Sequence, residues 1–479
     1  MNIKIRTRFA PSPTGYIHLG GIRTALFGWL LAKSLNGHFI LRIEDTDQNR
    51  EVKGSIEHII LSLNSLGLNY DEGPDLGGQY GPYIQSQRLS IYHQWAQKLV
   101  DQGLAYSDPY SEEEVEEFRL LAKSQKRPFL YREHRPQNLS GWDKGKALRF
   151  KSDPKKYTWK DLVMGELNSG EEAIDDFILI KADGFPTYNF AHIIDDHLME
   201  ISHIIRGQEF IASTPKYLNL YEALKINPPK MVTVPPILGP DGKKKLSKRD
   251  NAKDILEYLK EGYLKESLIN FISSLGWNDG STQEIYTIEQ IIQKFKIEDI
   301  QKSPARFDEQ KLIWINGHFI RNLKIDDLYE ISSNYLPKEA KDFDSNYQKS
   351  VLRLIQDRLK YLSEIPSLSS YFFKRPNIDY TLIKNNKVLS IINVDTLIDL
   401  LNKTVQELNK SDFSLDDLTA KLNNLLILTN QKPVVLFGLI RIAITQSPFS
   451  PGLFDTIYVL RKTETIQRIN DFIDYLKNN

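Results

Sequence analysis

The chain has 479 residues, with 41% hydrophobic and 26% charged side chains and equal numbers of basic and acidic groups, 62 of each. These values are typical of a globular protein of several domains, and they exclude a chain that binds polyanions through its net charge. Cysteine is absent, which excludes a disulfide framework, a thiolate zinc site and a cysteine nucleophile. Because the N-terminus lacks a signal-peptide pattern and no run of about 18 apolar residues occurs, we expect a cytoplasmic protein without a membrane span.

The first predicted elements are a strand, a turn rich in proline and glycine, and a helix. Apolar and charged residues alternate in 2–9, "NIKIRTRF", which predicts a half-buried strand. Residues 22–37, "IRTALFGWLLAKSLNG", have helical apolar spacing and end in a helix stop signal. In the turn between them, prolines hold the chain extended and glycines let a ligand approach the backbone. The following helix N-terminus suits a phosphate, which His18 is placed to contact; a capped turn with a surface histidine is the alternative.

The rest of the chain predicts several domains. Strand and helix patterns alternate through the first hundred residues and again from about residue 189, which predicts a parallel, doubly wound sheet. Between these parts, an acidic stretch gives way to a lysine-dense one, as expected for an insertion. The last third is helix-rich and nearly free of glycine, which predicts an all-α domain. We therefore expect these segments: 1–100 and 189–238 as the two halves of the sheet domain, 101–188 as the insertion, 239–321 as a basic loop with helices, and 322–479 as the helical domain.

A second candidate motif is the loop 239–250, "GPDGKKKLSKRD". Lysines on a loop that starts with proline and glycine can neutralise the charge that develops as pyrophosphate leaves a nucleotide. Lys248 is the strongest candidate, because the neighbouring Ser247 can also donate to a phosphate. A solvated basic loop is the alternative if this motif is taken alone. Together with the N-terminal turn, the motif favours a nucleotide site.

The two motifs resemble the paired signatures of class I aminoacyl-tRNA synthetases, here "HLGG" at 18–21 and "KLSKR" at 245–249. The order of further stretches over nearly the whole chain is similar to that of bacterial-type glutamyl-tRNA synthetases. These stretches are "RFAPSPTG", "LRIEDTD", "DGFPTYNFA", "DDHLM", "SHIIRGQE", "STPK" and "SPFSPGLFDTI". The resemblance implies a Rossmann-type α/β catalytic domain, an inserted acceptor-binding domain, a stem-contact region, an all-α anticodon-binding domain and a monomeric protein.

The resemblance also implies roles for individual residues. ATP with Mg²⁺ would be bound by Pro11, Ser12, Thr14, Gly15, His18, Gly20, Gly21, Lys245, Leu246, Ser247, Lys248 and Arg249, of which His18 and Lys248 would be catalytic. The glutamate pocket would be lined by Arg8, Ser12, Glu44, Tyr188, Arg206 and Glu209. Guanidinium groups suit a substrate with two carboxylates, and a fixed anion suits its ammonium group. No zinc is expected, because "AYSDPYS" at 105–111 lacks the cysteines that hold zinc in some relatives.

The implied reaction has two steps and needs no protein nucleophile. The α-carboxylate of glutamate attacks the α-phosphate of ATP, and the terminal adenosine of tRNA(Glu) then takes the glutamyl group; some relatives also charge tRNA(Gln). In this family, activation of glutamate generally requires bound tRNA. Arg353 and Arg358 are candidates to read an anticodon base. Plausible contacts to tRNA phosphates are Lys144, Lys146, Arg149, Lys151, Lys155 and Lys156.

Four alternatives are less consistent with the sequence. A glutaminyl-tRNA synthetase normally ends in β-barrels, and the tRNA-modifying paralogue lacks an anticodon-binding part. A small-molecule nucleotidyltransferase would not explain "KLSKR" or the length. A non-catalytic relative would not be expected to keep the candidate site residues. Two departures from the family pattern, His192 and Gln208, are expected to alter the polarity of the amino-acid pocket.

Overall fold

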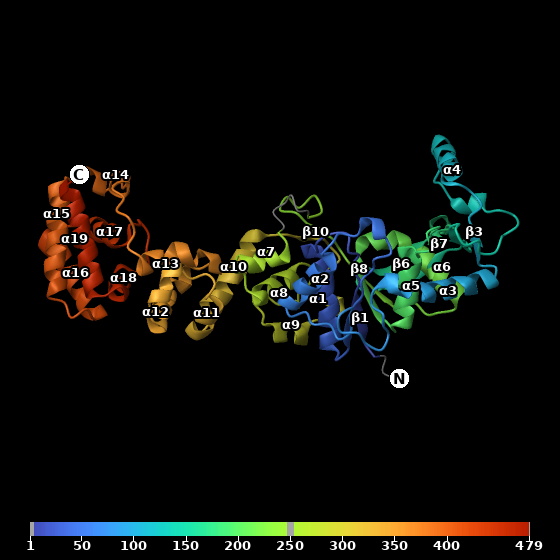
Figure 1. Cartoon of the computed structure of the whole chain (residues 1–479), viewed down its shortest axis with the longest axis horizontal. Coiled ribbons are helices and arrows are strands. Elements are labelled where there is room, and N and C mark those ends of the chain that lie inside the picture. The colour runs from blue at the N-terminus through green and yellow to red at the C-terminus, as the bar shows by residue number, and fades with distance from the viewer. Residues whose placement is uncertain (1–3, 247–252, 479) are drawn as a thin grey trace. The chain divides into compact units, whose positions relative to one another are not determined.

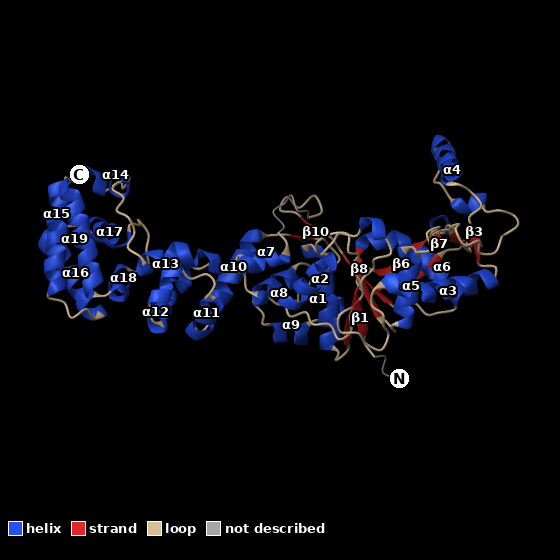
Figure 2. Ribbon diagram, in the orientation of Figure 1, coloured by secondary structure: helices blue, strands red, loops and turns tan. Residues whose placement is uncertain are grey.

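The computed structural model describes residues 4–246 and 253–478. The chain divides into two compact units, an N-terminal unit of Met1–Lys260 with Lys265–Leu312 and a C-terminal unit of Glu261–Leu264 with Ile313–Asn479 (Figure 1). Figure 2 shows strands only in the N-terminal unit, whereas the described part of the C-terminal unit is helical. Within the described ranges, no helix is both long and apolar enough to span a bilayer.

The core of the N-terminal unit is a six-stranded sheet with the order β2-β1-β8-β9-β5-β6. All neighbouring strands run parallel except the β5–β6 pair. The chain passes from β1 to β2 on one side, and β8 lies on the other, so the topological switch falls between β1 and β8. The predicted doubly wound parallel sheet is thus confirmed. The strands are β1 (Arg6–Phe9), β2 (His38–Leu41), β3 (Ala105–Ser107), β4 (Leu148–Phe150), β5 (Tyr157–Asp161), β6 (Gly165–Ser169), β7 (Ile178–Ile180), β8 (His203–Gly207), β9 (Lys230–Val234), β10 (Ile237–Leu238) and β11 (Ala305–Arg306).

Strand β1 is fully buried, so the predicted half-buried strand was wrong. Both of its arginines lie inside, Arg6 with 2% and Arg8 with 6% of the side chain exposed. A central strand of a parallel sheet is covered on both faces, so its charged residues need internal partners. Arg6 pairs with Glu72 at 2.9 Å and Arg8 with Asp196 at 3.0 Å. The alternating charged residues of this strand therefore form buried ion pairs and do not face solvent.

Helices cover the sheet and connect its strands. Helix α1 follows the N-terminal turn and ends at Ser34. Asn36, just after the C-cap, has a left-handed φ of 51°, as the stop signal predicts. The helices of this unit are α1 (Leu19–Ser34), α2 (Ser55–Ser65), α3 (Leu89–Asp101), α4 (Glu112–Ser124), α5 (Tyr188–Leu198), α6 (Thr214–Leu224), α7 (Ile255–Lys260), α8 (Lys265–Ser274) and α9 (Ile288–Lys294). Helix α10 (Glu309–Arg321) crosses the boundary between the units.

The segment 101–188 contributes to two sheets. Strands β3, β4 and β7 form a separate three-stranded antiparallel sheet. Strand β5 pairs with β9 instead, and β6 pairs antiparallel with β5, so both extend the main sheet. Only part of this segment is therefore separate from the sheet of the N-terminal unit.

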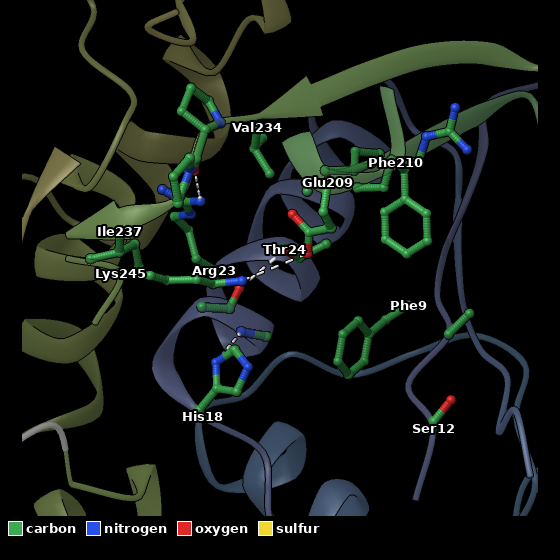
Figure 3. Close-up of a pocket in the computed structure, with 18 of the residues that line it drawn as sticks. Phe9, Ser12, His18, Arg23, Thr24, Glu209, Phe210, Val234, Ile237 and Lys245 are labelled. Atoms are coloured by element: carbon green, nitrogen blue, oxygen red, sulfur yellow. Dashed lines mark hydrogen bonds and ion pairs between the residues drawn. The ribbon is translucent and has the colours of Figure 1, made fainter. Parts of the chain in front are cut away.

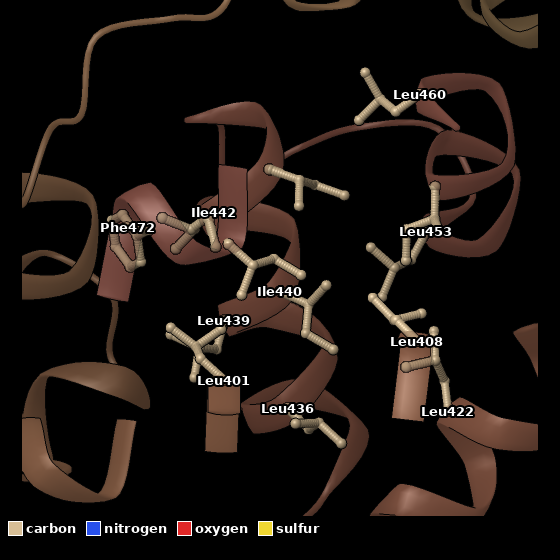
Figure 4. Close-up of a cluster of buried hydrophobic side chains, with 14 of the residues drawn as sticks. Leu401, Leu408, Leu422, Leu436, Leu439, Ile440, Ile442, Leu453, Leu460 and Phe472 are labelled. Carbon is tan, nitrogen blue, oxygen red and sulfur yellow. The ribbon is translucent and has the colours of Figure 1, made fainter. Parts of the chain in front are cut away.

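The C-terminal unit is built around a large aliphatic cluster (Figure 4). Leu401 of α15, Leu439 of α17 and Phe472 of α19 are fully buried in it. Apolar residues at helical spacing drive these amphipathic helices together. The helices are α11 (Ile325–Ile331), α12 (Ser345–Ile355), α13 (Ile365–Phe373), α14 (Thr381–Lys384), α15 (Val394–Asn409), α16 (Leu415–Thr429), α17 (Pro433–Thr445), α18 (Leu453–Leu460) and α19 (Lys462–Asn478).

Candidate active site

A cavity of about 310 Å³ opens at the carboxyl ends of β1 and β8. This is the switch point of the sheet, where open α/β folds place their ligands. Sequence-predicted residues that line it are Arg8, Ser12, His18, Gly20, Gly21, Glu44, Tyr188, Arg206, Glu209 and Lys245. The structure thus brings parts of both motifs and of the predicted glutamate pocket to one cavity (Figure 3).

His18 is the N-cap of helix α1. Its backbone is extended, and its Nδ1 atom accepts a hydrogen bond from the backbone N–H of Gly21 at 3.2 Å. A neutral imidazole that accepts at Nδ1 carries its proton on Nε2. The capping geometry therefore makes Nε2 a donor beside the positive end of the helix dipole, an arrangement that suits phosphate.

A group of buried charges surrounds Arg8 and Glu44, two residues that line the cavity. Arg8 donates to both oxygens of Asp196, at 3.0 and 3.2 Å. Arg42 donates to Asp196 and to Glu44, each at 2.8 Å. Burial acts to raise the pKa of Asp196, but Arg8 and Arg42 hold this pKa well below its usual range. Arg8, which was predicted to bind a substrate carboxylate, thus already forms an ion pair with a carboxylate of the protein.

Glu44 is the buried anion among the residues that line the cavity, whereas Glu209 is exposed. Its side chain is 4% exposed, and its backbone N–H donates to the carbonyl of Pro11, which ties the strand end to the proline-rich turn. Burial raises the pKa of Glu44 to about 6, against the lowering effects of Arg42 and Arg8. The group is therefore ionised at neutral pH and close to its titration range.

Arg206 is a buried cation of the cavity that forms no ion pair with a described carboxylate. It is 6% exposed, and its Nη2 atom donates to the hydroxyl of Thr214 at 2.6 Å. Its Nε atom makes no hydrogen bond, and no carboxylate among the described residues pairs with it. Burial lowers the pKa of this guanidinium. A buried cation without a counter-ion is costly, which indicates a site for an anionic ligand.

Tyr188 lines the cavity, whereas His192 and Tyr217 pack behind it and do not line the cavity. The ring of Tyr188 stacks on His192 with centroids 4.6 Å apart, and His192 meets Tyr217 edge-on at 4.7 Å. His192 is 1% exposed, and its Nδ1 donates to the carbonyl of Tyr188 at 2.6 Å. Burial lowers the pKa of His192 to about 3, so the ring is neutral. Gln208, the other departure from the family pattern, is exposed.

The lysine motif approaches the cavity from a short hairpin. Figure 3 shows Lys245 extending toward Glu209, and the two groups form an ion pair at 3.7 Å. Both side chains are more than half exposed, so the pair contributes little stability and a phosphate can compete for the lysine. A residue predicted for ATP thus lies beside a residue predicted for glutamate.

Other predicted residues lie elsewhere. Pro11, Thr14, Gly15 and Leu246 are near these elements but do not line the cavity. Ser247, Lys248 and Arg249 fall outside the described residues.

The sequence analysis missed Arg23, which lines the cavity from the second turn of α1. Its place in an apolar helical run gave no sign of function. The only signal in the sequence was a charged residue within the apolar spacing of that helix, and the structure shows that this arginine is buried.

The predicted tRNA contacts are placed unequally. Arg149 is buried and paired with Asp108 at 2.5 Å, whereas Lys144, Lys146, Lys155 and Lys156 are exposed and Lys151 is partly so. In the C-terminal unit, Arg353 is exposed and lies near Asp326. Arg358 is also exposed and lies near Arg441, whose pKa is lowered mainly by burial and further by the charge of Arg358.

Comparisons with known proteins agree with this geometry. The catalytic-domain model of class I tRNA synthetases (E and Q) matches residues 4–314, and an anticodon-binding-domain model matches residues 327–473. The chain is 39% identical to a glutamate–tRNA ligase 2 of Caldicellulosiruptor saccharolyticus, over 97% of this chain and 98% of the relative. It is 40% identical to a glutamate–tRNA ligase of Dehalococcoides mccartyi, strain 195, over 98% of each chain.

A solved structure extends the likeness to the fold. The glutamate tRNA ligase of Elizabethkingia meningosepticum, crystallised in complex with its amino acid, superposes with a TM-score of 0.87 at 30% identity, over 99% of this chain and all of that one. These matches confirm the predicted family and enzyme class, and the helical C-terminal unit separates the chain from the expected β-barrels of a glutaminyl-tRNA synthetase. The chain belongs to the glutamate–tRNA ligases of the class I aminoacyl-tRNA synthetase family.

Proposed function

We propose that the cavity at the ends of β1 and β8 holds L-glutamate and the α-phosphate of ATP side by side. The observation that carries this proposal is the buried Arg206 guanidinium, which lacks an internal counter-ion in a cavity that also contains the Glu44 carboxylate. Arg206 would bind a carboxylate of the substrate, and Glu44 its ammonium group. Fixed charges of both signs thus suit an amino acid with a second carboxylate.

In the first step, an α-carboxylate oxygen of glutamate attacks the α-phosphorus, and pyrophosphate leaves. The N-terminus of α1 and the Nε2–H of His18 would stabilise phosphate oxygens as charge moves toward the leaving group. Lys245 would exchange Glu209 for a phosphate, and Lys248 is proposed to act with it. In the second step, a ribose hydroxyl of the terminal adenosine attacks the glutamyl carbonyl, and AMP leaves.

Mg²⁺ is proposed to enter as part of the nucleotide, where it neutralises triphosphate charge. Among the described residues, no group of three or more His, Asp or Glu side chains could hold a metal ion. The donors of the cavity are mainly cationic or backbone N–H groups, which fit phosphate rather than a cation. No step is therefore assigned to a resident metal.

The nucleic-acid partner is proposed to be tRNA(Glu), with charging of tRNA(Gln) as the alternative for a less selective enzyme. The exposed lysines of segment 101–188 would contact acceptor-end phosphates. The anticodon would meet the surface of the C-terminal unit near Arg358, where two guanidinium groups lie close together. We propose that the chain acts as a monomer, which sedimentation of the free protein tests.

The decisive experiment is aminoacylation with radiolabelled glutamate and transcripts of both tRNAs, comparing the wild type with Arg206→Lys and Lys248→Ala. We expect charging of tRNA(Glu) by the wild type. A lysine cannot form the paired hydrogen bonds of a guanidinium, so Arg206→Lys should raise the KM for glutamate about tenfold to a hundredfold, with the KM for ATP little changed. If the wild type charged neither tRNA, the proposal would fail, whereas an unchanged glutamate KM in Arg206→Lys would contradict the role of Arg206 alone.

A further inference from the structure

The segment that carries the lysine motif is attached at both of its described ends to the first helices of the chain. On the incoming side, Leu246 donates to the carbonyl of Ile237, and Gly239 donates to that of Lys244, both at 2.8 Å. These hydrogen bonds tie the backbone of Lys245 to β10. Whatever holds the start of β10 therefore also sets the position of Lys245 relative to the cavity.

Arg23 holds the start of β10. Its Nη2 atom donates to the carbonyl of Pro235, and its Nη1 atom donates to that of Leu275, just beyond α8, at 2.9 Å. The side chain is 4% exposed, its Nε atom makes no hydrogen bond, and burial lowers its pKa to about 10. Arg23 thus links the helix that His18 caps to the root of the lysine hairpin.

A planar guanidinium suits this link better than any other side chain. Its donors are fixed in a fork, so one group can bridge two carbonyls that belong to different elements. The Leu275 carbonyl follows the C-terminal end of α8, where a positive charge is favourable. Neither carbonyl neutralises the charge, so the burial of Arg23 is compensated by these hydrogen bonds and by the nearby carboxylate of Glu209.

His58 holds the outgoing side. On α2, its Nε2 atom lies 2.7 Å from the carboxylate of Asp254, and both side chains are nearly buried. The other oxygen of Asp254 accepts from the backbone N–H of Leu256 at 2.8 Å and so caps α7. The ring of Tyr16, from the proline-glycine turn, stacks on His58 with centroids 4.3 Å apart. One imidazole therefore joins the turn, α2 and the start of α7.

We propose that Arg23 and His58 are positioning residues that register the two nucleotide-binding motifs against each other. Arg23 sets the distance between the His18 cap and Lys245, and His58 sets that between the proline-glycine turn and Asp254. Neither residue needs to touch the nucleotide for this role. The inference rests on the proposed function, because it assumes that both motifs act on one ATP molecule.

The first test separates the geometry of Arg23 from its charge. We compare Arg23→Met, which removes the charge and both hydrogen bonds, with Arg23→Lys, which keeps the charge but cannot bridge both carbonyls. ATP–pyrophosphate exchange with tRNA present gives KM values for ATP and glutamate, and thermal melting checks folding. Loss of one charge-assisted hydrogen bond corresponds to about a tenfold effect or more. We expect both variants to raise the KM for ATP by at least that factor while the KM for glutamate stays within about twofold.

The matched control is Arg132→Lys. Arg132 also donates to two backbone carbonyls, those of Glu171 and Ile174, but it does not line the cavity. Its ATP KM should equal that of the wild type. Wild-type ATP affinity in a folded Arg23→Lys would overturn the role of Arg23, since charge alone would then suffice. An inactive wild type would instead contradict the proposed function.

The second test uses His58 and decides the matter even if the Arg23 variants do not fold. His58→Leu keeps the volume but removes the donor to Asp254, whereas His58→Gln retains an N–H group. We expect His58→Leu to raise the KM for ATP about threefold to tenfold, and His58→Gln to recover most of that loss. Equal effects on ATP and glutamate, or no difference between the two variants, would show that His58 supports only the fold.

Discussion

The two units of this chain are stabilised in different ways. In the C-terminal unit, the buried side chains that the structure describes are aliphatic, aromatic or small and polar, and Arg468 is the single charged one among them. In the N-terminal unit, charged side chains are buried at many positions. They are Arg6, Arg8, Arg23, Arg42, Glu44, Asp45, Glu72, Arg88, Asp108, Arg149, Asp161, Asp176, Asp195, Asp196 and Arg206.

This difference follows from what each unit must present to its ligand. A site for small charged substrates needs fixed charges in a region of low dielectric, and those charges need partners such as the Arg8–Asp196 pair. A surface that meets a tRNA can keep its cations in solvent, as Arg353 does, so its core can remain apolar. Arg206 and Arg23 are exceptions to this pairing, because neither forms an ion pair with a described carboxylate.

The largest effect should come from removing one charge of the buried group around Arg8 and Glu44. Asp196→Asn would leave Arg8 and Arg42 without their shared carboxylate, so we expect a loss of about 3–5 kcal/mol in the free energy of unfolding. Denaturant titration measures it. The same change at exposed Asp143, which lies 3.7 Å from Lys146, should cost less than about 1 kcal/mol. Similar values for the two variants would mean that buried charge does not distinguish the units.

The C-terminal core should respond to volume rather than charge. Leu439→Ala removes a fully buried side chain from the cluster in Figure 4, with an expected loss of about 2–5 kcal/mol. Ile427→Ala, at a position 79% exposed, should change stability little. Thermal melting of both variants checks this, and a mild effect of Leu439→Ala would indicate a loosely packed core.

The N-terminal unit should also respond to pH through its buried Glu44. Burial raises the pKa of Glu44 from its ordinary 4.5 to about 6 in the folded protein. Only the carboxylate can bind an ammonium group, so the KM for glutamate should rise about tenfold per pH unit below about 6. Stability changes in the opposite sense. Between 4.5 and 6 the folded state retains a proton that the unfolded chain has lost, so this group's contribution to stability falls as pH rises through that window.

Measuring the glutamate KM between about pH 5 and pH 7.5 checks the binding half of this prediction. The variant Glu44→Gln should show a weak and pH-independent affinity over that range. A flat wild-type profile would assign the ammonium site to another group.

The smallest effects are expected at the surface of the C-terminal unit. Arg358→Ala should weaken tRNA(Glu) binding by about 1–3 kcal/mol, because the like charges of Arg358 and Arg441 repel each other and favour an anionic or acceptor-rich ligand. Arg353→Ala should cost less than about 1 kcal/mol, since Arg353 lies near the carboxylate of Asp326. Filter binding at fixed salt compares them, and the reverse order would exchange their roles.

Much of the fold and part of the candidate site could be predicted from the sequence. Helical spacing and stop signals predicted α1 to within a few residues, and the order of strands and helices predicted the parallel sheet. His18 and Glu44 could be placed at a helix start and a strand end, because those positions depend on local backbone geometry. Helices, strands and their ends can be predicted from the sequence because the interactions that determine them join residues close together in the chain.

Long-range partners could not be read in that way. The pairing of Arg8 with Asp196 joins residues far apart in the chain, so alternation in β1 was mistaken for solvent exposure. Arg23 and His58 looked like ordinary members of amphipathic helices, and their contacts to Pro235 and Asp254 exist only once the sheet has formed. Sequence patterns therefore determined the elements and the kind of chemistry. Tertiary packing determined which charges are paired inside and left Arg206 without an internal ion pair, because the burial of a charge depends on every element around it.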